Sequence, residues 1–255
     1  MATVAIGDIH GNRAALDDLL GQLETEVGRG DVVVFLGDYI DRGPDSRGCI
    51  DRILTLRDAI RAEVVCLRGN HEDWFLRTKE DYTRHSWLLG MEGLDTIRSY
   101  SAEAVRILRD ALGAAGLELY TRRCALPYDV FFEAMPASHK EFFDRLTLSF
   151  RNDDCICTHA GLDPRLTGFA DQTPESLIWG DARFPDAYCG AETVVYGHWD
   201  DATPDAHGWP LPRVGLNTIG IDTISYGVLT AIRMPDRRVF QSARYLAASS
   251  SPDAV

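Results

Sequence analysis

Short apolar runs recur along the chain, and a polar, glycine-containing turn follows each of them. Residues 3–6, 31–36 and 63–67 are rich in valine and other apolar side chains, a composition typical of strands buried on both faces of a sheet. Between these runs, apolar residues recur at helical spacing over 12–27 and 46–60. The strands follow one another at about thirty residues, the length of a βαβ unit. This part of the chain therefore predicts parallel strands connected by amphipathic helices.

The middle of the chain, from about residue 73 to residue 151, breaks this rhythm. It carries helical patterns over 101–115 and 138–150 together with many aromatic residues. An insertion of this kind usually packs over a site as a cap, and we interpret most of its aromatic side chains as its own core.

The last third of the chain returns to strand patterns. A stretch rich in glycine and proline at 202–212 predicts a surface loop rather than a domain boundary. We expect one domain over residues 1–246, with the cap at about 73–151 and a disordered tail at 247–255. The further strand patterns lie at 154–158, 193–196 and 227–234, with an edge strand near 238–244.

The net charge and the cysteine content limit which binding partners and which cellular compartment are expected. The net charge of −13 argues against nucleic acid or an anionic membrane, because both reward basic surfaces. No apolar run approaches the ~20 residues that a membrane span needs. The six cysteines include no CxxC pair, and the first strand pattern leaves no room for a signal peptide. We therefore expect a cytoplasmic protein; its oligomeric state is not predictable from the sequence.

Candidate chemistry lies in five turns that directly follow predicted strands: GDIHG, GDYIDRG, RGNHE, HAG and GH. Open α/β sheets place their sites at the carboxyl ends of strands, so these turns are expected to meet. A single GD or GH pair is ordinary turn chemistry, and a lone histidine after a strand is more often part of the core. Five such turns in one chain are what favours a metal site. The candidate metal ligands are Asp8, His10, Asp38, Asn70, His159 and His198.

These oxygen and nitrogen ligands suit two divalent ions. We expect manganese, with iron, zinc or magnesium as alternatives, rather than copper(I) or an iron–sulfur cluster. Asp38 is the natural bridge between the two ions, because a carboxylate has two oxygens. Two such ions are the usual equipment for the attack of water on a phosphate ester.

Residues beside the ligands suggest the remaining chemistry. Asp41 is placed to hold the imidazole of His71 as a cation, which would raise the pKa of His71 and suit it to protonate a leaving alkoxide. Arg42, Arg68 and the amide of Asn70 are candidates to bind phosphate oxygens. Ordinary surface ion pairing is the alternative for both arginines.

With these motifs, the chain resembles the phosphoprotein phosphatase branch of the calcineurin-like metallophosphoesterases, in its bacterial form. The pattern GDxHG, GDxxDRG, GNHE, HAG and GH is present in full and in order, and the resemblance covers about residues 4–234. Smaller segments such as WLLGMEGLDTIRSY, FFDRLTLSF, HAGLDP and IDT also fit. The resemblance implies an α/β fold: a metallophosphoesterase-type β-sandwich flanked by helices, with a helical cap insertion.

The resemblance also implies a mechanism. A hydroxide that bridges the two metals would attack phosphorus directly, without a phosphoenzyme, and His71 supported by Asp41 would be the general acid. Arg42 would bind phosphate, and the family's second arginine is assigned to Arg183 of the WGDARF segment. The chain departs from the family pattern at two positions near the site. Trp199 follows the GH motif in place of the family's threonine, and Glu92 stands where the bacterial pattern has glycine.

The leading interpretation is a metal-dependent serine/threonine protein phosphatase, with phosphotyrosine as a possible further substrate. The alternative within the same fold is a symmetrical diadenosine tetraphosphate hydrolase or a small nucleotide phosphatase. The Asp41–Arg42–Gly43 sequence favours the protein phosphatase. A non-catalytic scaffold is disfavoured because every ligand and the acid histidine are present, and a nuclease is disfavoured by the acidic surface. The substrate is accordingly expected to be a phosphoprotein or a small phosphoester.

Overall fold

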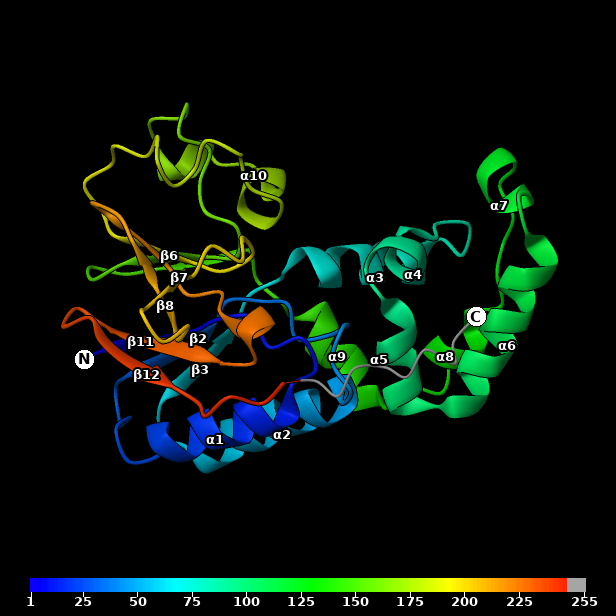
Figure 1. Cartoon of the computed structure of the whole chain (residues 1–255), viewed down its shortest axis with the longest axis horizontal. Coiled ribbons are helices and arrows are strands. Elements are labelled where there is room, and N and C mark those ends of the chain that lie inside the picture. Colours follow the sequence, from blue (N-terminus) through cyan, green and yellow to red (C-terminus); the bar gives the residue numbers. More distant parts are fainter. Residues whose placement is uncertain (247–255) are drawn as a thin grey trace.

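The computed structural model describes residues 1–246, so the predicted tail at 247–255 lies outside the described residues. Its first sheet has the order β12–β11–β1–β2–β3. The strands β1, β2 and β3 run parallel, whereas β11 pairs antiparallel with the other edge of β1. Figure 1 shows this sheet beside the helices α1 and α2. The bounds are β1 Thr3–Ile6, β2 Val32–Phe35, β3 Glu63–Cys66, β11 Thr230–Met234 and β12 Arg238–Gln241.

The second sheet has the order β4–β5–β6–β10–β9. Here β5, β6 and β10 run parallel, and the strands β4 and β9 are antiparallel edges. A separate two-stranded hairpin is formed by β7 (Thr203–Pro204) and β8 (Pro210–Leu211), where the sequence predicted only a surface loop. The bounds are β4 Ser149–Arg151, β5 Ile156–Thr158, β6 Val194–Tyr196, β9 Arg213–Val214 and β10 Thr218–Gly220.

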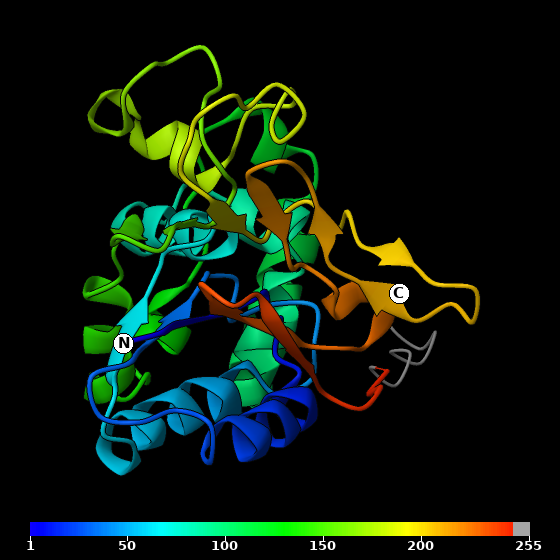
Figure 2. The ribbon, with the colours of Figure 1, turned by 90° about the vertical axis from the view of Figure 1, so that its left-hand side faces the viewer.

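Alternation along the strands explains how the two sheets pack. In β2, Val33 and Phe35 join the apolar cluster under the helices, whereas Val32 and Val34 face the second sheet. Successive side chains of a strand point to opposite faces, so a strand between two layers must be apolar throughout. In the second sheet, Val195 faces the first sheet and its neighbours in β6 pack toward α10 and the loops around it. The predicted α/β class, with two packed sheets flanked by helices, is confirmed (Figure 2).

Helices α1 (Arg13–Leu23) and α2 (Ser46–Ala59) cover the outer face of the first sheet. In α1, Leu16, Leu19, Leu20 and Leu23 are buried, as helical spacing predicts for one apolar face. Asn12 and Asp45 cap the two helices by accepting hydrogen bonds from the first-turn N–H groups of Ala15 and Gly48. Both helices therefore begin directly after a turn that carries candidate site residues.

The chain between β3 and β4 is helical and extends to one side of the sheets (Figure 1). Its core is aromatic: Phe75, Trp87, Phe131 and Phe143 are all buried within the same cluster. The expected helix over 138–150 is shorter, because Thr147 bridges Leu67 and the next residues form an edge strand. The helices are α3 Asn70–Glu80, α4 Ser86–Gly90, α5 Gly93–Tyr100, α6 Ala102–Ala115, α7 Glu118–Thr121, α8 Asp129–Phe132 and α9 Ala137–Asp144.

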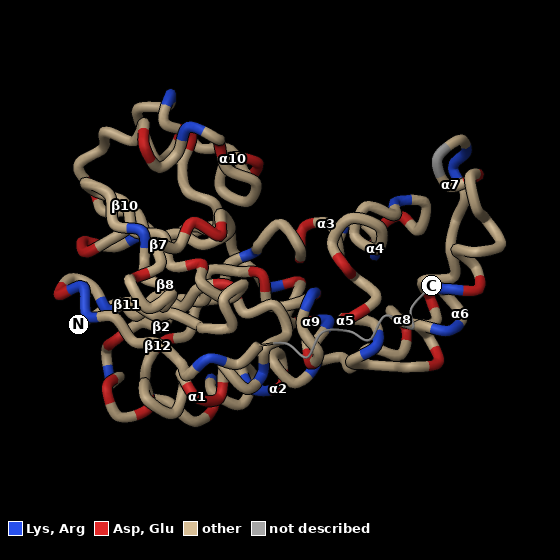
Figure 3. The backbone as a smooth tube through the Cα atoms, in the orientation of Figure 1, with Lys and Arg blue, Asp and Glu red and all other residues tan. Residues whose placement is uncertain are grey.

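The remaining helical pieces follow the second sheet's strands. They are α10 Pro174–Ile178 and two 3₁₀ turns, Phe169–Asp171 and Ile224–Tyr226. Within residues 1–246, no helix is long and apolar enough to cross a membrane. Basic and acidic residues are interspersed along the traced chain, as Figure 3 shows, and many of its arginines are paired with a nearby carboxylate.

Candidate metal centre

Strand register brings the candidate ligands to one edge of the molecule. Ile6 pairs with Phe35 and Phe35 with Cys66, so the carboxyl ends of β1, β2 and β3 are level. The turns that follow carry Asp8, Asp38 and Asn70. The second sheet delivers His159 directly after β5 and His198 two residues after β6. The structure therefore assembles one site from the edges of both sheets, as the sequence predicted from the strand-to-turn pattern.

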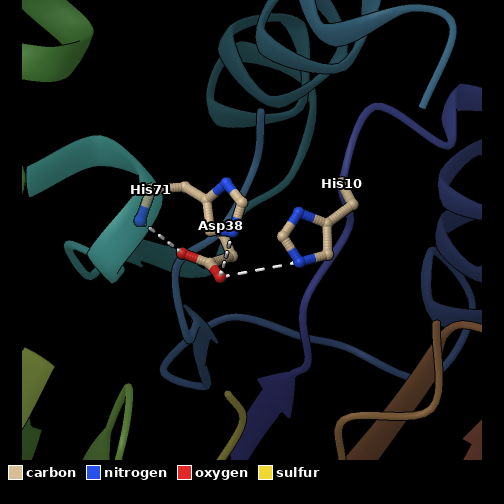
Figure 4. A group of neighbouring side chains, drawn as sticks. All are labelled: His10, Asp38 and His71. Carbon is tan, nitrogen blue, oxygen red and sulfur yellow. Dashed lines mark hydrogen bonds and ion pairs between the residues drawn. The ribbon is translucent and has the colours of Figure 1, made fainter. Parts of the chain in front are cut away.

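One cluster of donor atoms surrounds the carboxylate of Asp38. His10 Nε2 lies 3.5 Å and His71 Nε2 lies 3.8 Å from Asp38 Oδ2. Figure 4 shows these three side chains converging from the turns after β1 and β2 and from the start of α3. The backbone N–H of His71 also donates to Asp38 Oδ1 at 3.1 Å, which fixes the orientation of the carboxylate.

A second cluster lies on the other oxygen of Asp38. His159 Nε2 is 3.5 Å from Asp38 Oδ1 and 2.9 Å from Asn70 Oδ1. His198 Nδ1 is 3.0 Å from the same Asn70 oxygen. The two clusters therefore share Asp38, the arrangement expected of a carboxylate that serves two ions.

Protonation states show that the residues fit cations. Burial lowers the pKa of His159, and burial together with His159 lowers the pKa of His198 to about 3, so both imidazoles are neutral near pH 7. Because His159 Nδ1–H donates to the Leu36 carbonyl, its Nε2 presents a lone pair to the Asn70 oxygen. With the Asn70 oxygen on this side of the amide, the two lone pairs 2.9 Å apart repel each other, and a cation bound to both atoms relieves that repulsion. The buried Oδ1 of Asp8 likewise has no hydrogen-bond partner among the described residues.

The imidazoles are held by hydrogen bonds from their far nitrogen. Nδ1 of His10 is 2.9 Å from the Ile40 carbonyl and Nδ1 of His159 is 3.0 Å from the Leu36 carbonyl. A histidine that donates one ring N–H to a backbone carbonyl presents the other nitrogen in a fixed direction, as metal-ligating histidines do. Both accepting carbonyls belong to the segment that follows β2. The turn that carries Asp38 therefore also orients the imidazoles of His10 and His159.

The carboxylate of Glu72 ties the turns after β2 and β3 together. It accepts the backbone N–H groups of Asp38 and Tyr39, each at 2.9 Å, and that of Gly69 at 3.0 Å. Burial and the neighbouring Asp38 raise the pKa of Glu72 to about 8. The sequence showed Glu72 within the RGNHE turn, but no role was predicted for it.

Backbone strain is concentrated on the candidate residues. Among the described residues, eight other than glycine have positive φ, and five of them are His10, Asp38, Asp41, Arg42 and His198. Each such conformation costs on the order of 1–3 kcal/mol and persists only where the surrounding structure holds it. This distribution is the one expected of functional turns, because strain of this kind gathers at active sites and ligand clamps.

The predicted pair of Asp41 and His71 is present in the structure. Asp41 Oδ2 lies 2.8 Å from His71 Nδ1, and both side chains are buried. Burial lowers the pKa of His71, but Asp38 and Asp41 raise it more, so it is raised overall. The Nε2 atom of His71 is buried without a hydrogen-bond partner in the described part of the chain. A proton carried on this atom would face the space beside Asp38.

Two residues of the helical region donate hydrogen bonds to Asp41, and the sequence did not predict either contact. Trp87 Nε1 donates to the Asp41 carboxylate at 3.0 Å, and the hydroxyl of Thr96 donates to it at 2.5 Å. Burial raises the pKa of Asp41 in spite of these donors and of His71. Trp87 lay within a segment noted for its resemblance, but its contact with Asp41 could not be read from spacing.

A further buried acid lies behind Asp8. Asp222, two residues after β10, accepts the N–H of Asp200 at 2.8 Å, and burial raises its pKa to about 7. Burial and the negative charges of Asp222 and Asp38 also raise the pKa of Asp8. The position of Asp222 after a parallel strand repeats that of His198, which is the signal that could have found it.

The three candidate arginines lie in different surroundings. Arg42 Nη1 lies 3.0 Å from His10 Nε2, inside the constellation. Arg68 is half-buried, and its Nε has no partner among residues 1–246. Arg183 does not join them: its guanidinium forms two hydrogen bonds with Asp181 and its side chain is 51% exposed. Asp181 therefore already occupies two of its N–H donors, and Arg183 as the second phosphate-binding arginine stays a prediction.

Known proteins with similar sequences include nucleotide hydrolases and a protein phosphatase. The chain is 27% identical over 255 residues to bis(5'-nucleosyl)-tetraphosphatase PrpE [asymmetrical] of Oceanobacillus iheyensis, covering 91% of this chain and 88% of that relative. It is 24% identical to the symmetrical bis(5'-nucleosyl)-tetraphosphatase of Nitrosospira multiformis, covering 95% and 96% of the two chains. Similarity to serine/threonine-protein phosphatase 1 of Salmonella typhimurium is higher, at 37%, but covers 38% of this chain and 41% of that one.

Solved structures and a family model agree on the fold. The structure of a protein described provisionally as a diadenosine tetraphosphatase matches with a TM-score of 0.57 at 20% identity, covering 96% of this chain and 94% of that one. At this identity the match shows the fold alone. The family model for the calcineurin-like phosphoesterases matches residues 1–202, which include all six predicted metal ligands. The chain therefore belongs to the calcineurin-like phosphoesterase family.

Proposed function

We propose that this protein is a metal-dependent hydrolase that cleaves a phosphoanhydride bond of dinucleoside polyphosphates. The observation that carries this proposal is the full-length similarity to bis(5'-nucleosyl)-tetraphosphatases, which extends over the helical region as well as the sheets. The protein phosphatase similarity covers little more than a third of the chain. The comparisons thus favour a nucleotide hydrolase, the alternative interpretation of the sequence, over a protein phosphatase, its leading interpretation.

The chain's own residues would hold two ions. We assign His10 and Asp38 to one ion and Asp38, Asn70, His159 and His198 to the other, because their donor atoms converge in this way. We add Asp8 to the first ion because it belongs to the same turn as His10 and its Oδ1 is buried without a partner among the described residues. Two divalent ions held there, manganese being our expectation, would supply Lewis acidity toward the phosphate and the attacking water.

The reaction joins water to phosphorus and breaks the bond to the bridging oxygen, which leaves with the second nucleotide. Arg42 and the amide of Asn70 bind the non-bridging oxygens of the phosphate, and Arg68 is a further candidate to bind them. His71, oriented by Asp41, delivers a proton from Nε2 to the leaving oxygen. This proton matters less for a leaving phosphate than for an alkoxide, because a phosphate is the weaker base.

A serine/threonine protein phosphatase is the second candidate, and one observation favours it. The Asp41–His71 pair is buried and fully oriented by Trp87 and Thr96, which suits protonation of a strongly basic alkoxide. The Asp41–Arg42–Gly43 sequence points the same way.

The experiment strips the protein with chelator, restores manganese, and compares two substrates at equal concentration. We expect metal-dependent cleavage of diadenosine tetraphosphate to exceed phosphate release from a phosphoserine peptide. The Asp38→Asn variant is the control, since it should be inactive on both. Faster turnover of the peptide would overturn the proposal in favour of the protein phosphatase, and inactivity on both would leave only a scaffold.

A further inference from the structure

A groove of about 670 Å³ lies beside the metal centre, between α3, α4 and the region of α7. Its walls combine apolar surface with cationic groups: Trp74 and Leu89 on the one hand, Arg77 and Arg84 on the other. No aspartate or glutamate is among the residues that line it, although the protein carries a net charge of −13. The groove therefore offers a flat aromatic surface and several N–H donors to a ligand rich in acceptors.

The groove begins one helical turn from the metal centre. Trp74 follows Asn70 by four residues in α3, so the two side chains lie on the same face, about 6 Å apart along the helix axis. The opposite wall approaches the site in the same way: Gly90 lies against the Trp74 ring, and the sulfur of Met91 lies 4.0 Å from Asn70 Nδ2. A molecule whose phosphate lies at Asn70 therefore reaches Trp74 with the group attached to that phosphate.

The aromatic surface is held in place from behind. The ring of Trp74 packs at 4.9 Å on that of Trp179, whose Nε1 donates to Asp73 Oδ2 at 3.0 Å. Asp73 also pairs with Arg77 at 2.8 Å. One buried carboxylate thus positions both a tryptophan behind the groove and an arginine along it, while Trp74 itself is partly buried.

The guanidinium groups keep donors free for a ligand. Arg77 and Arg84 are 46% and 54% exposed, and each has one carboxylate neighbour, Asp73 at 2.8 Å and Asp81 at 3.6 Å. A guanidinium has five N–H donors in a fixed plane, so one such contact leaves several available. Arginine donors pair with the acceptor edge of a purine, and tryptophan stacks on its face.

We propose that this groove binds the nucleoside of one half of the substrate, with the base stacked on Trp74 and its acceptor edge toward Arg77 and Arg84. This inference rests on the proposed function, since the groove would bind a base of the dinucleotide one turn of α3 away from the phosphate at Asn70. The class of ligand is a purine nucleoside 5'-phosphate, and a phosphoserine or phosphothreonine side chain offers no ring that would use the same surface.

The first test compares a substrate that has bases with one that has none. For Trp74→Ala, the ratio of kcat/KM for diadenosine tetraphosphate to that for inorganic tripolyphosphate should fall about 5- to 150-fold, the range for losing one base–aromatic stack. Trp74→Phe should recover part of the ratio. Trp209→Ala is the matched control, because Trp209 is a half-buried tryptophan that bonds Gln241 and lies outside the groove, and it should leave the ratio unchanged. An unchanged ratio in Trp74→Ala would overturn the inference.

The second test reads the stack directly in the chelator-treated protein. Adenosine 5'-monophosphate is titrated in, and ring-current shifts of the adenine protons are followed by NMR. We expect upfield shifts that Trp74→Ala abolishes and Trp209→Ala preserves. Shifts that survive in Trp74→Ala would overturn the groove as the base site. If wild-type protein shows Trp74-dependent shifts but cleaves no dinucleotide, the proposed function fails and the nucleoside site stands.

Discussion

At the scale of single residues, the carboxylate of Asp41 concentrates contacts from distant parts of the chain. It accepts hydrogen bonds from His71, Trp87 and Thr96, which are 30, 46 and 55 positions away. Each donor fixes one direction of the carboxylate, and the carboxylate in turn fixes the ring of His71. Trp87 and Thr96 therefore contribute to the chemistry through Asp41, although neither is a candidate metal ligand.

Replacing His71 by asparagine separates proton delivery from metal binding. We expect His71→Asn to retain two metals by elemental analysis, and to lose activity on an alkyl phosphate at least ten times more than on p-nitrophenyl phosphate. The reason is that a leaving alkoxide needs a proton, whereas nitrophenolate is a weak base; general acids contribute about 10²–10⁴-fold. Equal losses on the two esters would refute the acid role, and loss of a metal would make His71 a ligand.

Replacing Trp87 by phenylalanine removes one donor from Asp41 and leaves an aromatic ring in the core. A hydrogen bond to a charged group contributes about 1.5–3 kcal/mol, and we expect urea unfolding to show a loss of this order. Turnover should fall more for alkyl than for aryl phosphates, because His71 loses its fixed orientation. Trp209→Phe serves as the control. A loss of stability with an unaltered ratio between the two esters would mean that Trp87 only fills the core.

The local sequence pattern sufficed to predict which candidate ligands lie close together, but it did not predict the contacts of Trp87 and Thr96 with Asp41. Each of Asp8, His10, Asp38, Asn70, His159 and His198 lies within four residues of a strand end, so parallel-strand geometry alone brings them together. The bonds of Trp87 and Thr96 to Asp41 depend instead on how the helical region packs on the sheet. The ion pair of Arg183 with Asp181 was likewise not predicted, although the two residues are neighbours in the WGDARF segment.

At the scale of elements, the turns after the strands are built around close contacts that exclude a side chain. A Cβ on Gly69 would lie 2.0 Å from Asp38 Oδ1 and 2.5 Å from the Asp38 nitrogen. A Cβ on Gly197 would lie 2.0 Å from Asp8 Oδ1. The glycines of the RGNHE and GH motifs thus let one turn approach the carboxylate carried by another.

Gly69→Ala should therefore act on the metal site through Asp38. We expect it to displace the carboxylate and lower manganese affinity at least tenfold, measured by calorimetry. Gly113→Ala is the control: this glycine lies within α6, and a methyl group added to it would meet no atom within 4 Å, so alanine should stabilise the helix by about 0.5–1 kcal/mol. Unchanged manganese affinity in Gly69→Ala would show that the turn can relax around the methyl group.

Element boundaries could be predicted where apolar runs were long. The expected helices at 12–27 and 46–60 are α1 and α2, shortened at their ends. The expected helix at 138–150 ends at Asp144 instead, because β4 pairs with β5 and tertiary pairing overrides the helical pattern. The hairpin of β7 and β8 escaped prediction because four paired residues carry no periodicity.

At the scale of the whole molecule, the site connects the two sheets. Asp8, Asp38 and Asn70 follow strands of the first sheet, and His159 and His198 follow strands of the second. Ions bound there would add cross-links between sheets that otherwise meet through an apolar layer. They would also relieve the repulsion among Asp8, Asp38 and Asp222.

Metal removal should accordingly lower the melting temperature. Ligand at a hundred times its Kd contributes about 2.7 kcal/mol per site, which corresponds to a rise of roughly 5–10 °C for a chain of this size. Differential scanning calorimetry with manganese and with chelator measures this shift. Asp38→Asn should melt at one temperature in both conditions. A wild-type melting temperature that chelator does not change would contradict a cross-link between the sheets.

The place of β1 in the first sheet has a consequence for biosynthesis. One edge of β1 pairs with β2, which leaves the ribosome soon after it, but the other edge pairs with β11 at Thr230–Met234. At a synthesis rate of about 5–20 residues per second, that edge stays open for on the order of 10 s or longer. During this interval a strand with three apolar residues out of four exposes unpaired N–H and C=O groups, a template for pairing with other nascent chains. Folding of this protein is therefore most vulnerable while it is still being translated, and chaperones that bind extended apolar segments would act on β1 first.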